Sequence, residues 1–133
     1  MKKNIVLGIL LVVMTSYYIR AQEKSSKPPP KIVRLDSFSP DSAQILDGPP
    51  ETIGMYAGYM VLPPSHSVGK HSTRNNEEVL VVLSGSGEFK ILGGITLQLK
   101  PYSVAYCPPH TEHDVTNTGA DTLRYVYIVA RTK

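Results

Sequence analysis

From residue 31 onward, apolar residues come in short runs that turn-forming residues interrupt. Pro63-Pro64, Gly93-Gly94 and Pro108-Pro109 each end such a run, and the chain has 11 Pro and 10 Gly among 133 residues. A helix needs an unbroken periodic stretch of about ten residues or more, whereas strands of about four to eight residues are normal. The sequence therefore predicts an all-β domain of the sandwich or barrel class.

The apolar runs give the expected positions of the strands. They are residues 32–35, 52–62, 78–83, 88–92, 95–99, 103–107, 113–116 and 123–130. Residues 93–94 are expected to form a two-residue hairpin turn, which requires positive φ angles and so favours glycine. A single helical turn is expected, around residues 39–44.

The first 21 residues resemble a secretory signal peptide. Lys2 and Lys3 precede an apolar run at residues 5–14, and Ala21 is a small residue before the polar Gln22. A membrane anchor is the alternative, but a spanning helix needs about 20 apolar residues and this run is shorter. We expect cleavage after Ala21, followed by export to a bacterial periplasm or secretion, with no membrane span left. Residues 22–31 are polar and Pro-rich, as in a spacer, so the folded domain is expected at 32–133.

The formal net charge of +3 does not indicate a nucleic-acid-binding protein. Three of the 14 basic residues lie in the first 21 residues and no acidic residue does, so the rest of the chain carries 11 of each sign. A balanced chain of this kind has no electrostatic basis for binding nucleic acid or an anionic membrane.

Cys107 is the single cysteine, so an internal disulfide or a multi-cysteine metal site is excluded. It ends an apolar run and has no basic neighbour in sequence. We therefore interpret it as a small buried hydrophobic residue rather than a nucleophile.

The four histidines lie within residues 66–113, in two clusters. In the first, His71 is followed by Glu78 and then by Gly85; in the second, Pro108 is followed by His113 and Asn117. At these positions, in segments 69–87 and 104–117, the chain resembles the cupin superfamily over about residues 55–131. The first cupin motif has His-x-His, then Glu, then Gly after a six-residue strand; the second runs Pro-x-Gly, His and Asn.

The resemblance implies a double-stranded β-helix, that is, a jelly-roll barrel with a metal ion inside. The family's ligands are three His and one Glu, but Thr73 replaces the second His here, and threonine is a poor ligand beside imidazole or carboxylate. The implied ligands are therefore His71, Glu78 and His113, a set that suits Fe(II), Mn or Zn with open positions for water or substrate. A small-molecule ligand and a homodimer are also implied. Thr73 is expected to hydrogen-bond a bound water or substrate.

Several neighbouring residues compete for roles at this site. Glu77 is the alternative to Glu78, but a one-residue slip puts it on the other face of the strand, and the spacing to Gly85 favours Glu78. We interpret His110 as a turn residue and His66 as a loop residue. With Glu112 they are the only candidates for a general base near the barrel mouth. Tyr125 and Tyr127 share one strand face and are expected to line the pocket.

Two functions fit this sequence. The first is a metal-dependent enzyme of the dioxygenase, isomerase or decarboxylase type, as in cupin relatives. The second is a non-catalytic module that binds a sugar or an organic acid and has lost the metal. A fold alone does not choose between them.

Overall fold

Nine β-strands and one short 3₁₀ turn make up the fold in the computed structural model, which describes residues 27–38 and 40–132. The turn, η1, is Leu35–Phe38. The strands are β1 (Ala43–Asp47), β2 (Met55–Leu62), β3 (His71–Ser72), β4 (Asn76–Ser84), β5 (Gly87–Ile91), β6 (Thr96–Leu99), β7 (Val104–Cys107), β8 (Glu112–Thr116) and β9 (Leu123–Arg131). The prediction of an all-β fold is confirmed.

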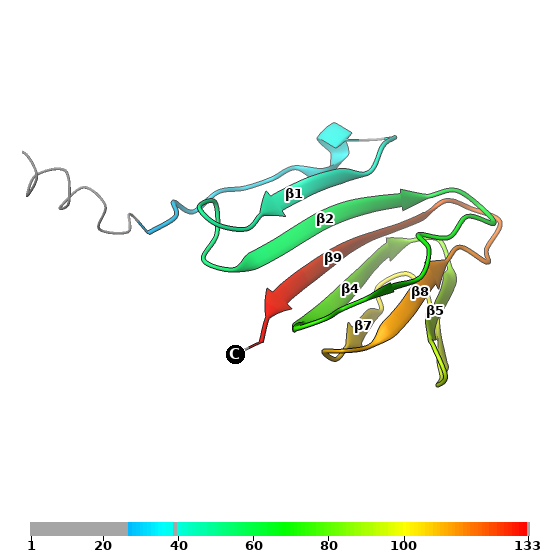
Figure 1. Ribbon diagram of the computed structural model, residues 1–133. Helices are drawn as coiled ribbons and strands as arrows, with labels where there is room; N and C mark the ends of the chain where they lie inside the picture. Colours follow the sequence, from blue (N-terminus) through cyan, green and yellow to red (C-terminus); the bar gives the residue numbers. More distant parts are fainter. Residues whose placement is uncertain (1–26, 39, 133) are drawn as a thin grey trace, which may run out of the picture.

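The strands form two antiparallel sheets that face each other (Figure 1). One sheet has the order β1-β2-β9-β4-β7 and the other β3-β8-β5-β6. The long strands β2, β9 and β4 lie side by side, and β8 and β5 lie across from them. This arrangement is the double-stranded β-helix that the sequence motifs imply.

The core lies between the two sheets, because alternate residues of each strand point inward. Leu80 and Val82 of β4, Phe89 of β5, Val115 of β8 and Leu123 of β9 are all buried there. Burying such a side chain contributes about 1.5–3 kcal/mol. The same alternation directs side chains inward at the end of the core where the histidines lie.

Gly85 shows why the first motif needs a glycine at that position. Its φ angle is +75°, and a Cβ atom there would lie 2.4 Å from the carbonyl oxygen of Thr122. A side chain is excluded by both backbone conformation and space. The turn after β4 can therefore pack directly against the start of β9.

Two predictions near the N-terminus are wrong. Residues 32–34 form no strand: Ile32 is 93% exposed, the segment makes no ladder with a described strand, and η1 follows directly. The helical turn lies at Leu35–Phe38 rather than around residues 39–44, where β1 begins. The strands β1 and β3 were not predicted.

The predicted signal peptide, residues 1–21, lies outside the described residues, as do residues 22–26 of the spacer and Ser39. Within the described part of the chain, no helix has the length and apolar character needed to cross a bilayer.

Candidate metal centre

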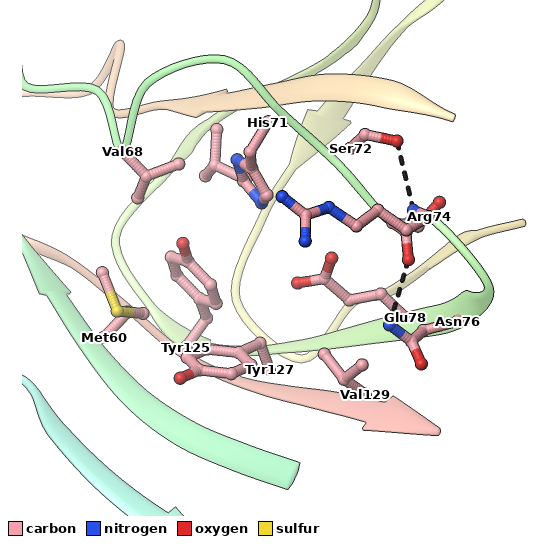
Figure 2. Close-up of a pocket in the computed structure, with 12 residues that line it drawn as sticks. Met60, Val68, His71, Ser72, Arg74, Asn76, Glu78, Tyr125, Tyr127 and Val129 are labelled. Atoms are coloured by element: carbon pink, nitrogen blue, oxygen red, sulfur yellow. Dashed lines mark hydrogen bonds between the residues drawn. The ribbon is translucent and has the colours of Figure 1, made fainter. Parts of the chain in front are cut away.

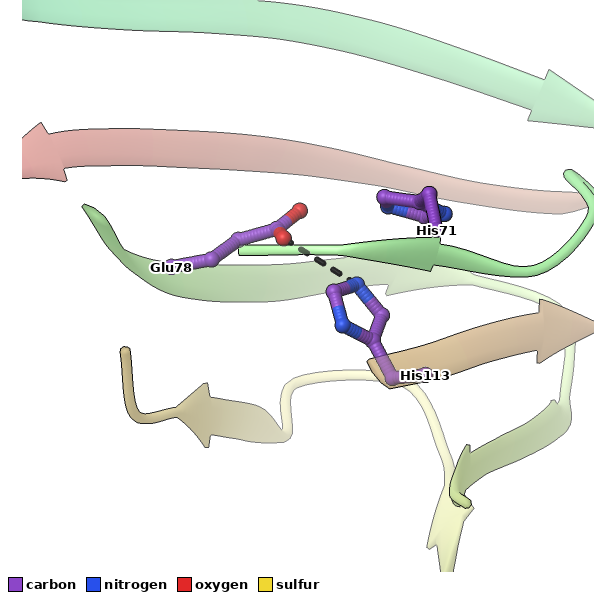
Figure 3. Close-up of side chains that lie close together, drawn as sticks. All are labelled: His71, Glu78 and His113. Atoms are coloured by element: carbon purple, nitrogen blue, oxygen red, sulfur yellow. Dashed lines mark ion pairs between the residues drawn. The ribbon is translucent and has the colours of Figure 1, made fainter. Parts of the chain in front are cut away.

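His71, Glu78 and His113 come together at one end of the barrel (Figure 3). Each side chain offers one ligand atom, and these atoms all lie within 4.8 Å of one another. His71 and His113 are direct cross-strand partners of β3 and β8, with ring centroids 4.2 Å apart, and Glu78 reaches them from β4 in the opposite sheet. The predicted ligand residues, far apart in sequence, are therefore neighbours in space.

The alternation of β4 explains why Glu78, and not Glu77, belongs to this cluster. Glu78 lies on the same face as the buried Leu80 and Val82, and only 11% of its side chain is exposed. Glu77 faces the other way, where its carboxylate accepts a hydrogen bond of 3.1 Å from the Tyr106 hydroxyl. Adjacent residues of one strand thus have separate environments.

Both histidines present a free Nε2 atom to the cluster. His71 Nδ1 lies 2.9 Å from the carbonyl oxygen of Gly69, and His113 Nδ1 lies 3.3 Å from that of Thr111. A carbonyl oxygen only accepts, so in the neutral form of each ring the proton is on Nδ1 and Nε2 has the lone pair. This is how metal-ligating histidines are commonly held, with the second ring nitrogen bonded to a carbonyl or carboxylate.

His113 Nε2 is buried and has no hydrogen-bond partner among the described residues. It lies 3.2 Å from Glu78 Oε2, with which it forms an ion pair when the ring is protonated. Burial lowers the pKa of His113, but the neighbouring Glu78 carboxylate outweighs burial and leaves this pKa above its ordinary value. A lone pair and a carboxylate that face the same point attract a cation there, either a proton or a metal ion. The residues present therefore fit a divalent metal ion.

A cavity of about 430 Å³ adjoins the cluster (Figure 2). Tyr125 and Tyr127 of β9 line it. The other members of its wall are Met60, Val68, His71, Ser72, Thr73, Arg74, Asn76, Glu78, Val115 and Val129. Its size is typical of a small-molecule site. The placement of both tyrosines agrees with the prediction made from their strand face.

Tyr127 spans the sheet from the cavity to its edge. Its ring lies over Gly58, where a Cβ atom would come within 2.3 Å of it, and its hydroxyl donates a hydrogen bond of 2.8 Å to Gln44 of β1. The ring is therefore a wall of the cavity, and its hydroxyl is already engaged on the far side of β2.

The comparisons with known proteins agree with this geometry. A family model described as "Cupin domain" matches residues 58–129, which is more than half of the chain. The chain belongs to the cupin domain family. A comparison with curated proteins gives no match.

Solved cupin structures resemble the whole barrel. A Cupin 2 conserved barrel domain protein from Salinispora arenicola superposes with a TM-score of 0.63 and 19% identity, covering 78% of this chain and 91% of that one. The Schizosaccharomyces pombe Cnp3 cupin domain gives 0.62 and 20% identity, with 68% of this chain and 64% of that chain covered, so the match spans less than two thirds of its length. A predicted oxalate decarboxylase from Thermotoga maritima gives 0.59 and 20%, with 77% and 100% covered. At these identities the likeness shows the fold.

Thr73, where cupins have their second motif histidine, links the two motifs. It is 6% exposed; its hydroxyl donates to the carbonyl oxygen of Pro108 at 2.8 Å and accepts from the backbone N–H of Thr111 at 3.0 Å. These bonds tie the segment after His71 to the loop before His113. One lone pair of the hydroxyl is left, so the predicted bond from Thr73 to a water or ligand stays a prediction.

Replacing Thr73 by valine is expected to lower the free energy of unfolding by about 2–4 kcal/mol. Valine keeps the size but leaves the Pro108 carbonyl and the Thr111 N–H without this partner, at about 1–3 kcal/mol for each group. Thr73→Ser keeps the hydroxyl and is expected to stay within about 1 kcal/mol of the wild type. Urea denaturation of the three proteins measures the difference, and a valine variant as stable as the serine variant would contradict it.

The other residues considered from the sequence lie outside the cavity wall. His66 is exposed, with Nδ1 3.0 Å from the Pro64 carbonyl oxygen, and His110 is exposed in a turn with a φ angle of +55°. Glu112 is exposed because it alternates with the buried His113 along β8. The structure does not bring these three candidate bases to the cluster of His71, Glu78 and His113.

Cys107 is fully buried, with its sulfur 3.5 Å from His113 Nδ1. Burial, together with the charge of Glu78, raises the pKa of the Cys107 thiol to about 11. The thiol therefore stays protonated and packs beside His113, in agreement with the interpretation as a buried apolar residue.

Arg74 is the cavity residue that sequence reasoning missed. It follows Thr73 directly and precedes two asparagines, residues that favour turns. Its φ angle of +51° lies in the left-handed region, and its side chain extends over the cavity (Figure 2). The turn-forming sequence was the available signal, but it does not give the direction of the side chain.

Proposed function

We propose that this chain is an exported cupin-domain protein that binds one divalent metal ion, Fe, Mn or Zn, through His71, Glu78 and His113. A small organic ligand binds beside the ion in the adjoining cavity. The observation that carries the proposal is the buried His113 Nε2, which in the neutral ring makes no hydrogen bond with a described residue and lies 3.2 Å from Glu78 Oε2. An unpaired buried polar atom costs about 1–3 kcal/mol, and an ion held between the two groups removes this cost.

The three side chains suit an ion by their chemistry. Two neutral imidazoles and one carboxylate give lone pairs, and the carboxylate offsets part of the ion's charge. The Gly69 and Thr111 carbonyls hold the two rings in the orientation that keeps each Nε2 available. A bound ion would supply a Lewis acid with positions left for a ligand.

If the ligand is turned over, the reaction belongs to the dioxygenase, isomerase or decarboxylase types. The decarboxylase type is the one named in the description of the Thermotoga maritima structure, a predicted oxalate decarboxylase. The role of this chain's own residues is to position the ligand. Burial, followed by the charge of Glu78, raises the pKa of both Tyr125 and Tyr127, so these phenols keep their protons at neutral pH.

Metal content of the exported protein tests the proposal. The whole gene, with residues 1–21, is expressed in a bacterium, and the protein is purified from the exported fraction without chelator or nickel resin. We expect an intact mass that begins at Gln22 and a near-stoichiometric divalent ion by elemental analysis. His71→Ala is expected to weaken metal binding roughly a hundredfold or more, because it removes a direct ligand.

His66→Ala is the matched control, since His66 is an exposed histidine outside the cluster. It is expected to keep the metal content of the wild type. Equal metal in both variants would contradict the assignment of His71, and a folded wild type that takes up no ion when offered would contradict the metal centre. A full-length mass in the exported fraction would contradict cleavage of residues 1–21 but would not bear on the metal centre.

A second candidate function is ligand binding without turnover. It is favoured by the neutral hydrogen-bonding groups of Ser72, Asn76 and Tyr125 in the cavity wall, which suit holding a ligand. The enzyme and the binding module are distinguished by incubating the metal-loaded protein with a ligand that it binds. Recovery of the ligand unchanged supports the binding module, and formation of product supports the enzyme.

A further inference from the structure

Arg74 places a positive charge over the candidate metal centre. Figure 2 shows its side chain entering the cavity, with the guanidinium between His71 and Glu78. Arg74 is therefore the cavity residue with a fixed positive charge, since arginine stays protonated at any accessible pH. Its backbone is held separately: the N–H is bonded to the Ser72 hydroxyl and the carbonyl accepts from His110.

The guanidinium makes no hydrogen bond or ion pair with any described residue. Other cations of the described chain do find acidic partners, as Arg34 does with Asp36 and Lys90 with Glu88. Glu78 lines the same cavity as Arg74, yet the ion pair that Glu78 makes is with His113. The five N–H donors of Arg74 are thus available to a ligand.

The charges of the cavity call for an anion once the metal is present. A divalent ion brings +2, Glu78 contributes −1 and Arg74 contributes +1, so the loaded site has an excess of positive charge. In a partly enclosed site such charge is only partly screened by water. A ligand with a negative group that reaches both the ion and Arg74 balances it.

A hollow next to the cavity has the same sign of charge. This hollow shares Arg74 with the cavity and also contains Arg131, at the end of β9, and Asn75. Among the described residues, no acidic side chain lines this hollow. Clefts lined by one sign of charge raise the local concentration of oppositely charged ligands.

The rest of the wall favours a carbon body on that anion. Met60, Val68, Val115 and Val129 line the cavity with the Tyr127 ring. We propose that the ligand of this site is a small carboxylate, bound with its carboxylate between the metal ion and Arg74 and its carbon body against this apolar wall. The assignment rests on the proposed metal centre and names the substrate class for it. A planar guanidinium suits a carboxylate because the two can form paired hydrogen bonds.

Calorimetric titration of the metal-loaded protein tests the proposal. The probes are benzoate and pyruvate, the neutral benzamide as a shape-matched control for benzoate, and inorganic phosphate. We expect a carboxylate to bind and benzamide to bind at least tenfold more weakly. Arg74→Gln is expected to weaken carboxylate binding roughly tenfold to a hundredfold, the size of a lost charge-assisted hydrogen-bond pair.

Arg131→Gln removes the same charge from the neighbouring hollow without touching the cavity wall. It is expected to bind carboxylates within about threefold of the wild type, because steering charges act mainly on association rate. Metal content is measured in all three proteins and is expected to be equal, since neither arginine is a metal ligand. Equal loss in both arginine variants would overturn the specific role of Arg74.

The remaining outcomes separate this proposal from the metal centre itself. Normal metal content with benzamide bound as tightly as benzoate, or with phosphate bound and neither carboxylate, would overturn the carboxylate assignment and leave the metal centre standing. If the wild type holds no metal, the proposed metal centre is wrong. The same titration, carried out on the protein as isolated, then tests the carboxylate assignment by itself. A preference for benzoate that depends on Arg74 would then still support the assignment, and no preference would overturn it.

Discussion

Glu78→Gln is expected to weaken divalent metal binding roughly a hundredfold or more while leaving the fold intact. Glutamine has nearly the same shape as glutamate but lacks the negative charge that offsets the ion. Among the described residues, the partner of Glu78 is His113, whose Nε2 lies 3.2 Å from Glu78 Oε2, so the exchange also weakens this ion pair. The metal-free variant is therefore expected to remain folded but to lose about 1–3 kcal/mol of stability relative to the metal-free wild type.

Competition with a coloured chelator measures the affinity, and thermal unfolding with and without metal measures the linked stabilisation. The wild type gains stability as metal is added, because binding to the native state alone shifts unfolding by mass action; the variant should gain little. Glu77→Gln is the control, since it removes the same charge one residue away on the outer face, where its partner is Tyr106. Similar metal affinities for the two variants would show that Glu78 is not a ligand.

Asn117→Ala is expected to lower the free energy of unfolding by about 3–5 kcal/mol. Asn117 is fully buried; its Nδ2 donates to the carbonyl oxygens of Leu62 at 2.7 Å and Asp121 at 2.9 Å, and its Oδ1 accepts from the N–H of Gly119 at 2.9 Å. Truncation leaves three backbone groups unpaired and creates a cavity, and each unpaired group costs about 1–3 kcal/mol. This amide holds the loop between β8 and β9 against the end of β2.

Urea denaturation followed by circular dichroism measures this loss, with an unchanged slope as the sign that only stability has changed. Asn75→Ala is the matched control, because Asn75 is exposed and its recorded hydrogen bonds use the backbone carbonyl. It is expected to change stability by less than about 0.5 kcal/mol. A loss below about 1 kcal/mol for Asn117→Ala would mean that water replaces the amide in the loop.

The central strands could be predicted because their signals are local. In β4 and β5, apolar residues alternate with polar or half-exposed ones, and glycines mark the turns that follow. A hairpin does join β5 and β6, but its turn is centred on Leu92 and Gly93 rather than on Gly93-Gly94 as predicted: Gly93 has a φ angle of +72°, and the Gly94 N–H donates to the Ile91 carbonyl oxygen at 3.0 Å. Such features depend on neighbours in sequence, so they can be read without knowing the partner strands.

The N-terminal part of the domain could not be predicted because its structure depends on distant partners. Residues 32–35 are apolar enough for a strand but pair with no strand of the described chain, whereas β1 exists because it pairs with β2. The two-residue strand β3 is likewise defined by its pairing with β8 rather than by its own sequence. Pairing across long separations leaves no periodic signal in so short a segment.

The grouping of His71, Glu78 and His113 could be predicted from motif spacing, but the position of Arg74 could not. The order of His71, Glu78 and His113 in the motifs was sufficient to bring them together, because each lies on a strand whose face is fixed by its buried neighbours. The direction of Arg74 depends on a left-handed turn at that residue. Residues other than glycine seldom adopt this conformation, so sequence alone gives no reason to expect it.

The hydrogen bond from Tyr127 to Gln44 makes the edge strand β1 part of the support for the ligand cavity. The ring can span β2 only because Gly58 has no side chain, so three strands share one contact. A force applied to β1 from outside, for example by a partner that pairs with this sheet edge, would reach the cavity wall without passing through the metal ligands. The edge of the sheet is therefore a second place from which ligand affinity can be tuned.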